Sequence, residues 1–375
     1  MSNKLIFSLM SKKWHKDGGD IYFNKHLSAI NNEIPLLYLN NESKIISVLV
    51  NLVHNKYFVY FFRFPLGSFF YYKISRFVAF YIVNISIFKF SSGIYKTIII
   101  PSGDLLAFEV AIKLKLTGKI KHIHFSILDL PWTYKNSKIN NSFIKNYFLK
   151  KIDIVDSADF ISDSMRNVFI ESNSKLVGEV VYPFVDLLEN EVINKNYFNK
   201  SDNNKKNIKI VFAGNLRFKK ELIQFVDTYS NMCFPFQFHL FSSSSVEHQN
   251  IINHEFVSSL ENLKFNFEDM DFGFIPFSFD IRDKELVETS FPSKFASYLS
   301  AGLPVIVFAP LYSLISKFVI EHELGVVLNE ITENYLNKID TNLYTKPYIQ
   351  NKVNILREIT QKNYEKIRKL LNIVN

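Results

Sequence analysis

Short apolar runs rich in β-branched residues alternate with longer mixed stretches in the first half of this chain of 375 residues. The runs 4–10, 97–101 and 122–128 predict strands. Helices are expected between them, over about 20–31 and 104–116. Strands that alternate with helices are typical of an α/β domain with a mostly parallel sheet. The first half therefore predicts a domain of this class.

The same alternation continues in the second half, after a stretch that is rich in Asn and Lys and poor in apolar residues. This stretch, 189–207, predicts a linker. Further strands are expected at 208–213, 234–241, 270–277, 305–309 and 324–328. A long helix from about 348 carries apolar residues near helical spacing. The predicted domains are 1–188 and 208–347, followed by a C-terminal segment, 348–375.

The segment 291–309, FPSKFASYLSAGLPVIVFA, combines a loop, a short helix, a sharp stop and a buried strand. Pro292 suits the first helical position, because its missing N–H costs little there. Gly302 suits the left-handed residue that ends a helix, and Pro304 prevents continuation. Lys294 adds a cation to the free N–H groups at the helix start, which is typical of an anion site. A helix packed on a sheet, without a ligand, is the alternative.

A second candidate anion site follows the strand at 208–213. Gly214 and Asn215 predict a turn, and the next helix begins near three cations: Arg217, Lys219 and Lys220. Cations at a helix N-terminus interact unfavourably with the helix dipole, so a purely structural role suits them poorly. A glycine turn, a helix start and cations together are typical of a diphosphate cradle. A solvated basic turn is the alternative.

Composition narrows the class of protein. Hydrophobic residues at 47% and charged residues at 21% are typical of a folded globular protein. Cys233 is the only cysteine, which excludes an intramolecular disulfide and a cysteine zinc site and favours a reducing compartment. The N-terminal apolar run is too short for a signal peptide, so we expect a cytoplasmic protein. No metal site is expected, because His122 and His124 lack a third ligand at suitable spacing.

Positive charge and aromatic residues are concentrated in the first half. Residues 1–185 contain 23 Lys and Arg against 13 Asp and Glu, whereas the remainder contains 21 against 23. The segment 57–90 contains 15 aromatic residues among 34. Its longest uncharged run, 77–88, would form a helix of roughly 18 Å, short of the roughly 30 Å that a bilayer requires. Aromatic residues mixed with cations favour a peripheral contact of 57–90 with an anionic membrane. A buried pair of helices is the alternative.

The first of the two anion-site candidates carries a family resemblance. The segment 291–309 contains the pattern P-x-K-x-x-x-Y-L-x-A-G-x-P-V, formed by Pro292, Lys294, Tyr298, Leu299, Ala301, Gly302, Pro304 and Val305. It resembles the nucleotide-sugar signature of GT-B glycosyltransferases, especially the bacterial group 1 or family 4-like polysaccharide glycosyltransferases. The segments 157–165, 181–186 and 270–277 also match this family, so the resemblance extends over nearly the whole chain.

The resemblance implies two Rossmann-like, doubly wound α/β domains that face each other across a cleft, with the last helix returning to the first domain. It implies a metal-independent, retaining, hexosyltransferase-like enzyme without a cofactor, whose donor is a nucleoside-diphosphate sugar, here a UDP-sugar. The acceptor would be a hydroxyl of a glycan or lipid-linked oligosaccharide of a growing surface polysaccharide, such as a capsule or a lipopolysaccharide O-antigen. The enzyme would act on the inner face of the cytoplasmic membrane.

Two other functions remain open at this point: a non-catalytic nucleotide-sugar-binding or partner subunit, and a GT-B nucleotide-sugar epimerase. Nucleic acid is not expected as a partner, because the cations form no recognisable binding motif. The sequence leaves the oligomeric state open.

Site residues follow from the same resemblance. Gly18 and Gly19 match a loop beside the acceptor and the donor phosphates. His124 and Asp129 match positions near the acceptor hydroxyl, with Asp129 favoured to orient it or accept its proton. A packed histidine and a turn-capping aspartate are the alternatives. The residues expected to stabilise or bind the donor are Arg217, Lys220, Gly214, Asn215, Lys219, Pro292, Ser293, Lys294, Ser297 and Tyr298.

One departure from the family pattern leaves the stereochemical outcome open. Many relatives carry two glutamates separated by seven residues across this region, the second of which holds the nucleotide ribose. Thr289 and Ser297 occupy these positions here, and Glu288 is one residue out of register. Ser297 can still donate a hydrogen bond to a ribose hydroxyl.

Overall fold

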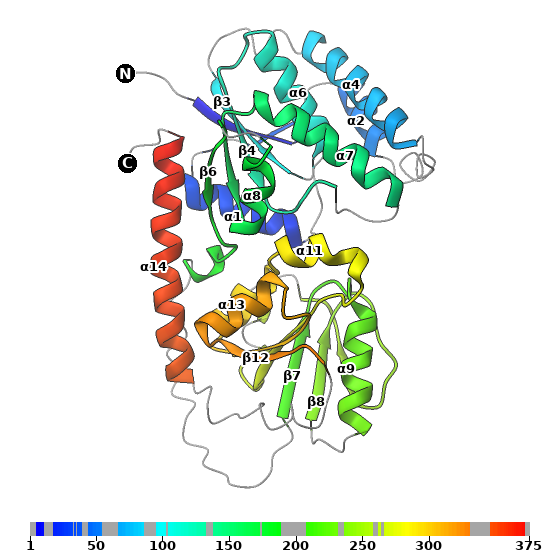
Figure 1. Ribbon diagram of the computed structural model, residues 1–375, viewed down its shortest axis with the longest axis vertical. Helices are drawn as coiled ribbons and strands as arrows, with labels where there is room; N and C mark the ends of the chain where they lie inside the picture. The colour runs from blue at the N-terminus through cyan, green and yellow to red at the C-terminus, as the bar shows by residue number, and fades with distance from the viewer. Residues whose placement is uncertain are drawn as a thin grey trace. The chain divides into compact units, whose positions relative to one another are not determined.

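The structure, a computed structural model, divides into two compact units (Figure 1). Unit 1 comprises Met1–Tyr182 and Asn363–Asn375, and unit 2 comprises Pro183–Lys362. The residues described are 5–10, 18–32, 34, 36–39, 44–54, 67–85, 95–102, 104–132, 138–172, 175–188, 208–231, 236–257, 262–263, 266–330 and 346–371.

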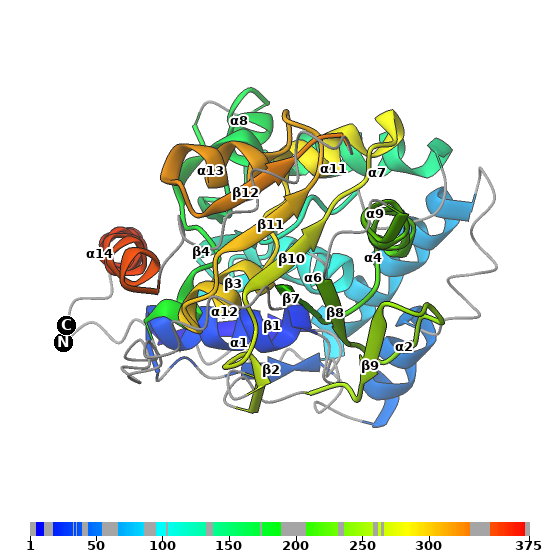
Figure 2. The ribbon, with the colours of Figure 1, turned by 90° about the horizontal axis from the view of Figure 1, so that it is seen from below.

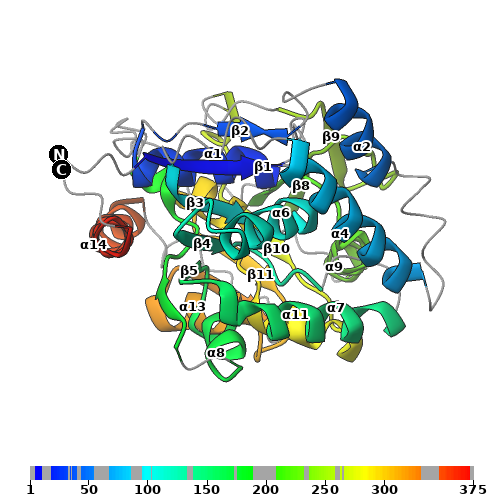
Figure 3. The ribbon, with the colours of Figure 1, turned by 90° about the horizontal axis from the view of Figure 1, so that it is seen from above.

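Unit 1 contains a six-stranded parallel sheet with strand order β2-β1-β3-β4-β5-β6 (Figure 3). The strands are β1 (Leu5–Met10), β2 (Leu36–Tyr38), β3 (Tyr95–Pro101), β4 (His122–Ile127), β5 (Ser157–Phe160) and β6 (Val177–Val180). The helices are α1 (Gly18–Ile30), α2 (Lys44–His54), α4 (Gly67–Ile85), α6 (Leu105–Leu116), α7 (Lys138–Lys151) and α8 (Asp163–Ile170), with the 3-10 turn η2 (Ile152–Ile154).

Side-chain caps begin two helices of unit 1. Asp104 accepts a hydrogen bond of 2.9 Å from the N–H of Ala107 at the start of α6. Ser162 accepts one of 3.1 Å from the N–H of Met165 at the start of α8. Each cap satisfies a backbone donor that has no partner within its helix. The predicted helix over 104–116 is confirmed, with Asp104 as its cap.

Unit 2 contains a second six-stranded parallel sheet, with strand order β12-β11-β10-β7-β8-β9 (Figure 2). Its strands are β7 (Ile208–Ala213), β8 (Phe236–Phe241), β9 (Ile251–His254), β10 (Phe272–Pro276), β11 (Val305–Phe308) and β12 (Gly325–Leu328). Its helices are α9 (Lys219–Asn231), α11 (Lys284–Thr289), α12 (Lys294–Ser300) and α13 (Leu314–His322), with 3-10 turns η3 (Val185–Leu187) and η4 (Ile281–Asp283). A long helix, α14 (Lys346–Leu370), begins in unit 2 and ends in unit 1.

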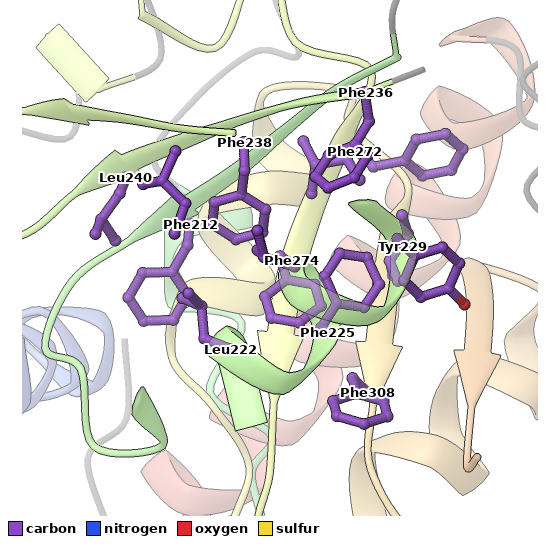
Figure 4. Close-up of a cluster of buried hydrophobic side chains, with 14 of the residues drawn as sticks. Phe212, Leu222, Phe225, Tyr229, Phe236, Phe238, Leu240, Phe272, Phe274 and Phe308 are labelled. Atoms are coloured by element: carbon purple, nitrogen blue, oxygen red, sulfur yellow. The ribbon is translucent and has the colours of Figure 1, made fainter. Parts of the chain in front are cut away.

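Phenylalanine side chains fill the space between α9 and the sheet of unit 2 (Figure 4). The Phe225 ring lies 4.5 Å from the Phe274 ring and 6.3 Å from the Phe238 ring, measured between centroids. Burial of such side chains contributes roughly 1.5–3 kcal/mol each. Part of the high aromatic content therefore lies in this core.

The predicted α/β class is confirmed, and both sheets are parallel. The helix expected from Asp20 begins two residues earlier, at Gly18. The strands β2, β6 and β9 were not predicted; they have only three, four and four residues. The predicted linker 189–207 lies outside the described residues, and of the aromatic segment 57–90 only 67–85 is described.

Candidate functional site

The strand order of unit 2 indicates a ligand site beyond the carboxyl ends of two central strands. The order reverses between β7 and β10, which are neighbours although two strands separate them in sequence. In open parallel sheets, ligands bind beyond the carboxyl ends of the strands at such a switch point. The loop after β7 contacts the loop after β10 through Phe218 and Phe277, whose ring centroids lie 5.1 Å apart. These two loops define the candidate site.

The turn after β7 depends on Gly214, whose φ is +121°. Residues with a side chain rarely adopt this conformation, so glycine is favoured there. The N–H of Gly214 donates a hydrogen bond of 2.9 Å to the carbonyl of Phe241, which ties the turn to the end of β8. A Cβ at this position would lie 3.7 Å from Cε and 3.9 Å from Nζ of Lys294. The turn and Lys294 are therefore in direct proximity.

Lys294 brings a partly desolvated charge to this turn. Its Nζ lies 4.2 Å from the centroid of the Phe212 ring, a cation–π contact. No carboxylate pairs with it among the described residues, and burial lowers the pKa of Lys294 to about 8. Partial burial of an unpaired ammonium group costs free energy, and a bound anion would offset this cost. Lys294 therefore places this charge beside the turn at Gly214.

Tyr298 supports the site from within the core. Its hydroxyl accepts a hydrogen bond of 3.0 Å from the N–H of Ala213, the last residue of β7. The side chain is fully buried, and burial raises the pKa of Tyr298 well above its ordinary value. The ring covers Gly273 so closely that a Cβ there would overlap it. Tyr298 was predicted to bind substrate; in the structure its buried hydroxyl holds the end of β7 in place.

The cations after Gly214 lie on the surface. Arg217, Lys219 and Lys220 are exposed, as is Asn215, and α9 begins at Lys219. The Arg217 guanidinium lies 5.6 Å from the Phe218 ring centroid. Within the described part of the chain, none of the three cations forms an ion pair. Their convergence with Lys294 on one diphosphate stays a prediction.

Helix α12 follows the predicted pattern, with a later start. Its first residue is Lys294, preceded by Ser293 without a side-chain cap and by half-buried Pro292. Gly302, with φ of +75°, ends it in the left-handed conformation, as predicted. Ser297 donates a hydrogen bond of 2.9 Å to Oδ2 of Asp186, which lies in η3. This helix is thus bonded to a carboxylate from a segment 111 residues away.

The side chains at and beside the family's two glutamate positions are bonded to other residues of this chain. Thr289 donates a hydrogen bond of 2.7 Å to the carbonyl of Glu285, within α11. Glu288 lies 3.7 Å from Lys284 on the exposed side of the same helix. Ser297 is half-buried, and its hydroxyl donates to Asp186. Thr289 and Ser297 therefore provide no carboxylate at the two family positions.

In unit 1, three of the residues predicted near the acceptor, Gly18, Gly19 and Asp129, lie at a helix start or just after a strand. Gly18 is the first residue of α1, and Gly19 follows in its first turn. Asp129 is half-buried just after β4. Its backbone N–H and that of Leu128 donate to Oγ of Ser102 at 3.3 and 3.2 Å. Asp129 therefore lies in a loop that is held to the end of β3.

His124 lies inside unit 1, in a network of buried polar groups. Its Nδ1 is joined to Oγ of Ser157 at 2.8 Å, and its Nε2 to Oδ1 of Asp159 at 2.7 Å. The ring has no exposed surface. Asp159 Oδ2 lies 3.3 Å from Nε2 of His26, which belongs to α1. His124 has both ring nitrogens engaged, so Asp129 is the more accessible of the two predicted acceptor contacts.

No cluster of three or more His, Cys, Asp or Glu with a metal-binding arrangement occurs among the residues that the structure describes.

Comparison with known proteins agrees with this fold. Residues 210–371 match the family described as "Glucosyltransferase 3-like, C-terminal domain". The fold is similar to that of α,α-trehalose 6-phosphate synthase from Burkholderia multivorans, with TM-score 0.57 and 10% identity over 98% of this chain and 96% of that one. It is also similar to the glycotransferase of kitacinnamycin, with TM-score 0.52 and 10% identity over 98% of both chains. The chain has the GT-B fold of glycosyltransferases.

A third structure with this GT-B fold is the UDP-forming α,α-trehalose-phosphate synthase from Burkholderia xenovorans, solved with glucose-6-phosphate. The similarity has TM-score 0.51 and 10% identity over 81% of this chain and 77% of that one. No curated protein matches the chain in sequence.

Two functional candidates of this GT-B chain were missed from the sequence. Asp186 was seen only as the end of a family segment, because nothing local shows that it reaches Ser297. Gly273 was seen only as part of a strand, although it makes room for Tyr298. The spacing of D-x-G in the strand at 270–277 was the available signal for Gly273. For Asp186 no sequence signal was available.

Proposed function

We propose that this protein is a glycosyltransferase that moves a sugar from a UDP-sugar to a hydroxyl of a growing, lipid-linked surface oligosaccharide. The observation that carries the proposal is the Lys294 ammonium at the Gly214 turn, partly desolvated and unpaired among the described residues. A diphosphate would provide the missing negative charge through charge-assisted hydrogen bonds. The turn lies at the switch point where open α/β sheets bind nucleotides.

The cations would act on the leaving group. As the bond between the anomeric carbon and the diphosphate oxygen breaks, negative charge accumulates on that oxygen. Fixed cations lower the barrier when they lie where this charge develops. Lys294, joined by Arg217 and Lys220 from the neighbouring turn, would supply this stabilisation in a metal-independent reaction. The acceptor oxygen forms the new bond to the anomeric carbon, and its proton passes to a base, for which we favour Asp129.

Calorimetric titration of the full chain with UDP tests the donor site. We expect Lys294→Ala to bind UDP at least about tenfold more weakly, because one charge-assisted hydrogen bond contributes about 1.5–3 kcal/mol. The control is Lys317→Ala, which changes an exposed lysine of α13 in the same unit and should keep the wild-type affinity. Equal affinities of Lys294→Ala and the wild type would remove Lys294 from the donor site.

The pH dependence of the same titration provides a second readout. Free Lys294 has a pKa of about 8, and a bound diphosphate raises the pKa of an ammonium group. Binding of UDP at pH 8 should therefore take up protons, and binding at pH 6, where Lys294 is already charged, should take up few. Buffers with different ionisation enthalpies measure this uptake, and Lys294→Ala should abolish it.

A non-catalytic nucleotide-sugar-binding subunit is the second candidate. It is favoured by Thr289 and Ser297, which bond to neighbours and provide no carboxylate. Incubation with UDP-sugars, with and without oligosaccharide acceptors, separates the candidates by mass spectrometry. Transfer to an acceptor supports the glycosyltransferase, and NMR of that product tests the proposed retention at the anomeric carbon. UDP binding without any turnover supports the subunit, and isomerised donor without acceptor supports an epimerase.

A further inference from the structure

One face of α4 exposes aromatic side chains. Phe77, Phe80 and Tyr81 are 69%, 56% and 40% exposed. Lys73 and Arg76 are exposed beside them, one turn earlier on the same side of the helix. The opposite side, which includes Val78, Ala79, Ile82 and Val83, is buried. These five exposed residues, Lys73, Arg76, Phe77, Phe80 and Tyr81, are called the α4 face.

Two neighbouring helices extend the α4 face with aliphatic residues. Helices α2 and α6 both pack against α4 (Figure 3). On α2, Ile45 and Val48 are 57% and 67% exposed, and on α6, Leu116 is 67% exposed. Lys113 of α6 brings its Nζ to 5.3 Å from the centroid of the Phe80 ring. The three packed helices therefore expose aliphatic and aromatic side chains, and Lys113 places a cation beside an aromatic ring of the α4 face.

Within the described helices α2, α4 and α6, the exposed charges have one sign. Helices α2 and α4 contain no Asp or Glu. Helix α6 contains only Glu109, which is 2% exposed. A symmetric contact with a second copy of this chain would bring like charges together, which disfavours self-association here. The partner that complements this surface is anionic.

The aliphatic residues distinguish between anionic partners. Single-stranded nucleic acid stacks its bases on aromatic rings, but it gains little from exposed Ile45, Val48 and Leu116. A lipid bilayer accommodates aliphatic side chains in its acyl region, aromatic rings at headgroup depth and cations against anionic headgroups. No helix among the described residues is long and apolar enough to cross a bilayer, so the contact would be peripheral.

We propose that the α4 face, with Ile45, Val48 and Leu116, docks unit 1 on an anionic lipid bilayer. The three aromatic side chains would insert at the headgroup level, while Lys73, Arg76 and Lys113 face lipid phosphates. This proposal deepens the proposed function, since a lipid-linked acceptor would reside in the membrane that this face contacts.

Vesicle flotation of the full chain tests the docking surface. Vesicles of phosphatidylcholine with anionic phosphatidylglycerol should bind the wild type at low salt, and pure phosphatidylcholine should bind it much less. The triple variant Phe77→Ser, Phe80→Ser, Tyr81→Ser should partition at least about tenfold less, because binding scales with the apolar area inserted. The matched control is Ile252→Ser, Ile320→Ser, Ile355→Ser, in which the native side chains are 40%, 56% and 48% exposed in unit 2. It should bind like the wild type.

A single-site reporter covers the case in which the triple variant fails to fold. Phe77→Trp should shift its fluorescence to shorter wavelength when anionic vesicles are added, and Ile320→Trp should not. Absence of that shift, equal binding of the two triple variants, or binding to single-stranded RNA but not to vesicles would overturn the proposal. Calorimetry with UDP is run in parallel. If the wild type binds UDP but not vesicles, the docking surface alone is refuted. If the wild type does not bind UDP, the donor site is refuted.

Discussion

Two buried carboxyl groups in unit 1 have pKa values shifted in opposite directions. Burial raises the pKa of Glu109 to about 7, although the charge of Arg76 acts against it. Burial acts in the same direction on Asp159, but the charge of His26 and hydrogen bonds from His124 and His26 hold its pKa below the ordinary value. The neighbouring groups, and not burial alone, therefore decide which carboxylate stays ionised.

Glu109→Gln should change how stability depends on pH. A raised pKa means that the folded state favours the protonated acid. Its contribution to stability is complete below about pH 4.5, and it is lost as the pH rises through about 7. Glutamine stays neutral, so Glu109→Gln should be more stable than the wild type at pH 8, by up to about 3 kcal/mol. Urea unfolding at pH 5 and pH 8 measures the difference.

Asp153→Asn is the control for this measurement. Asp153 is exposed and lies in η2, the 3-10 turn that follows α7. It should leave the pH profile unchanged. If Glu109→Gln and the wild type show the same dependence on pH, Glu109 does not titrate as its burial requires.

Among the elements, long apolar runs were the most predictable. A parallel strand covered on both faces is a continuous apolar run, and β10, β11 and the last four residues of β7 have this character. The strand β9, with sequence IINH, is short and half polar, and its two central residues are exposed. It forms by pairing with the edge of β8, and no local sequence pattern predicts this pairing.

The last element, α14, is tied to unit 1 by a buried hydrogen bond. Tyr364 Oη is joined to Nδ1 of His26 at 2.9 Å, and His26 Nε2 is joined to Oγ of Ser126 at 3.0 Å. We expect Tyr364→Phe to lower the free energy of unfolding by about 1–3 kcal/mol, because a buried ring nitrogen loses its partner. The midpoint of urea unfolding at neutral pH measures this loss.

Tyr348→Phe serves as the comparison on the same helix. The Tyr348 hydroxyl donates a hydrogen bond of 2.8 Å to the carboxylate of Glu323, in an exposed position. Water can replace that partner, so the loss should be within about 1 kcal/mol. Losses of equal size at both positions would show that the buried network does not hold α14.

For the whole molecule, local motifs were predictable and long-range pairs were not. Gly214, Lys294 and Gly302 lie in short patterns whose chemistry can be recognised from neighbouring residues. The bond between Ser297 and Asp186 joins residues 111 apart. The network around His124 likewise depends on which strands become neighbours. Such contacts follow from the complete topology, so sequence patterns identified His124 without showing that it is enclosed.

The two proposed ligands concern different units, and hydrogen exchange measured by mass spectrometry can separate them. UDP should slow exchange in the peptides that contain the Gly214 turn and α12, because a bound ligand stabilises only states in which its site is formed. Anionic vesicles should slow exchange in α4 and leave the Gly214 turn unchanged. Lys294→Ala should lose the first effect and keep the second, while the triple serine variant of the α4 face should do the reverse. If one variant loses both effects, or if UDP protects α4 in place of the Gly214 turn, the assignment of the two ligands to separate units is wrong.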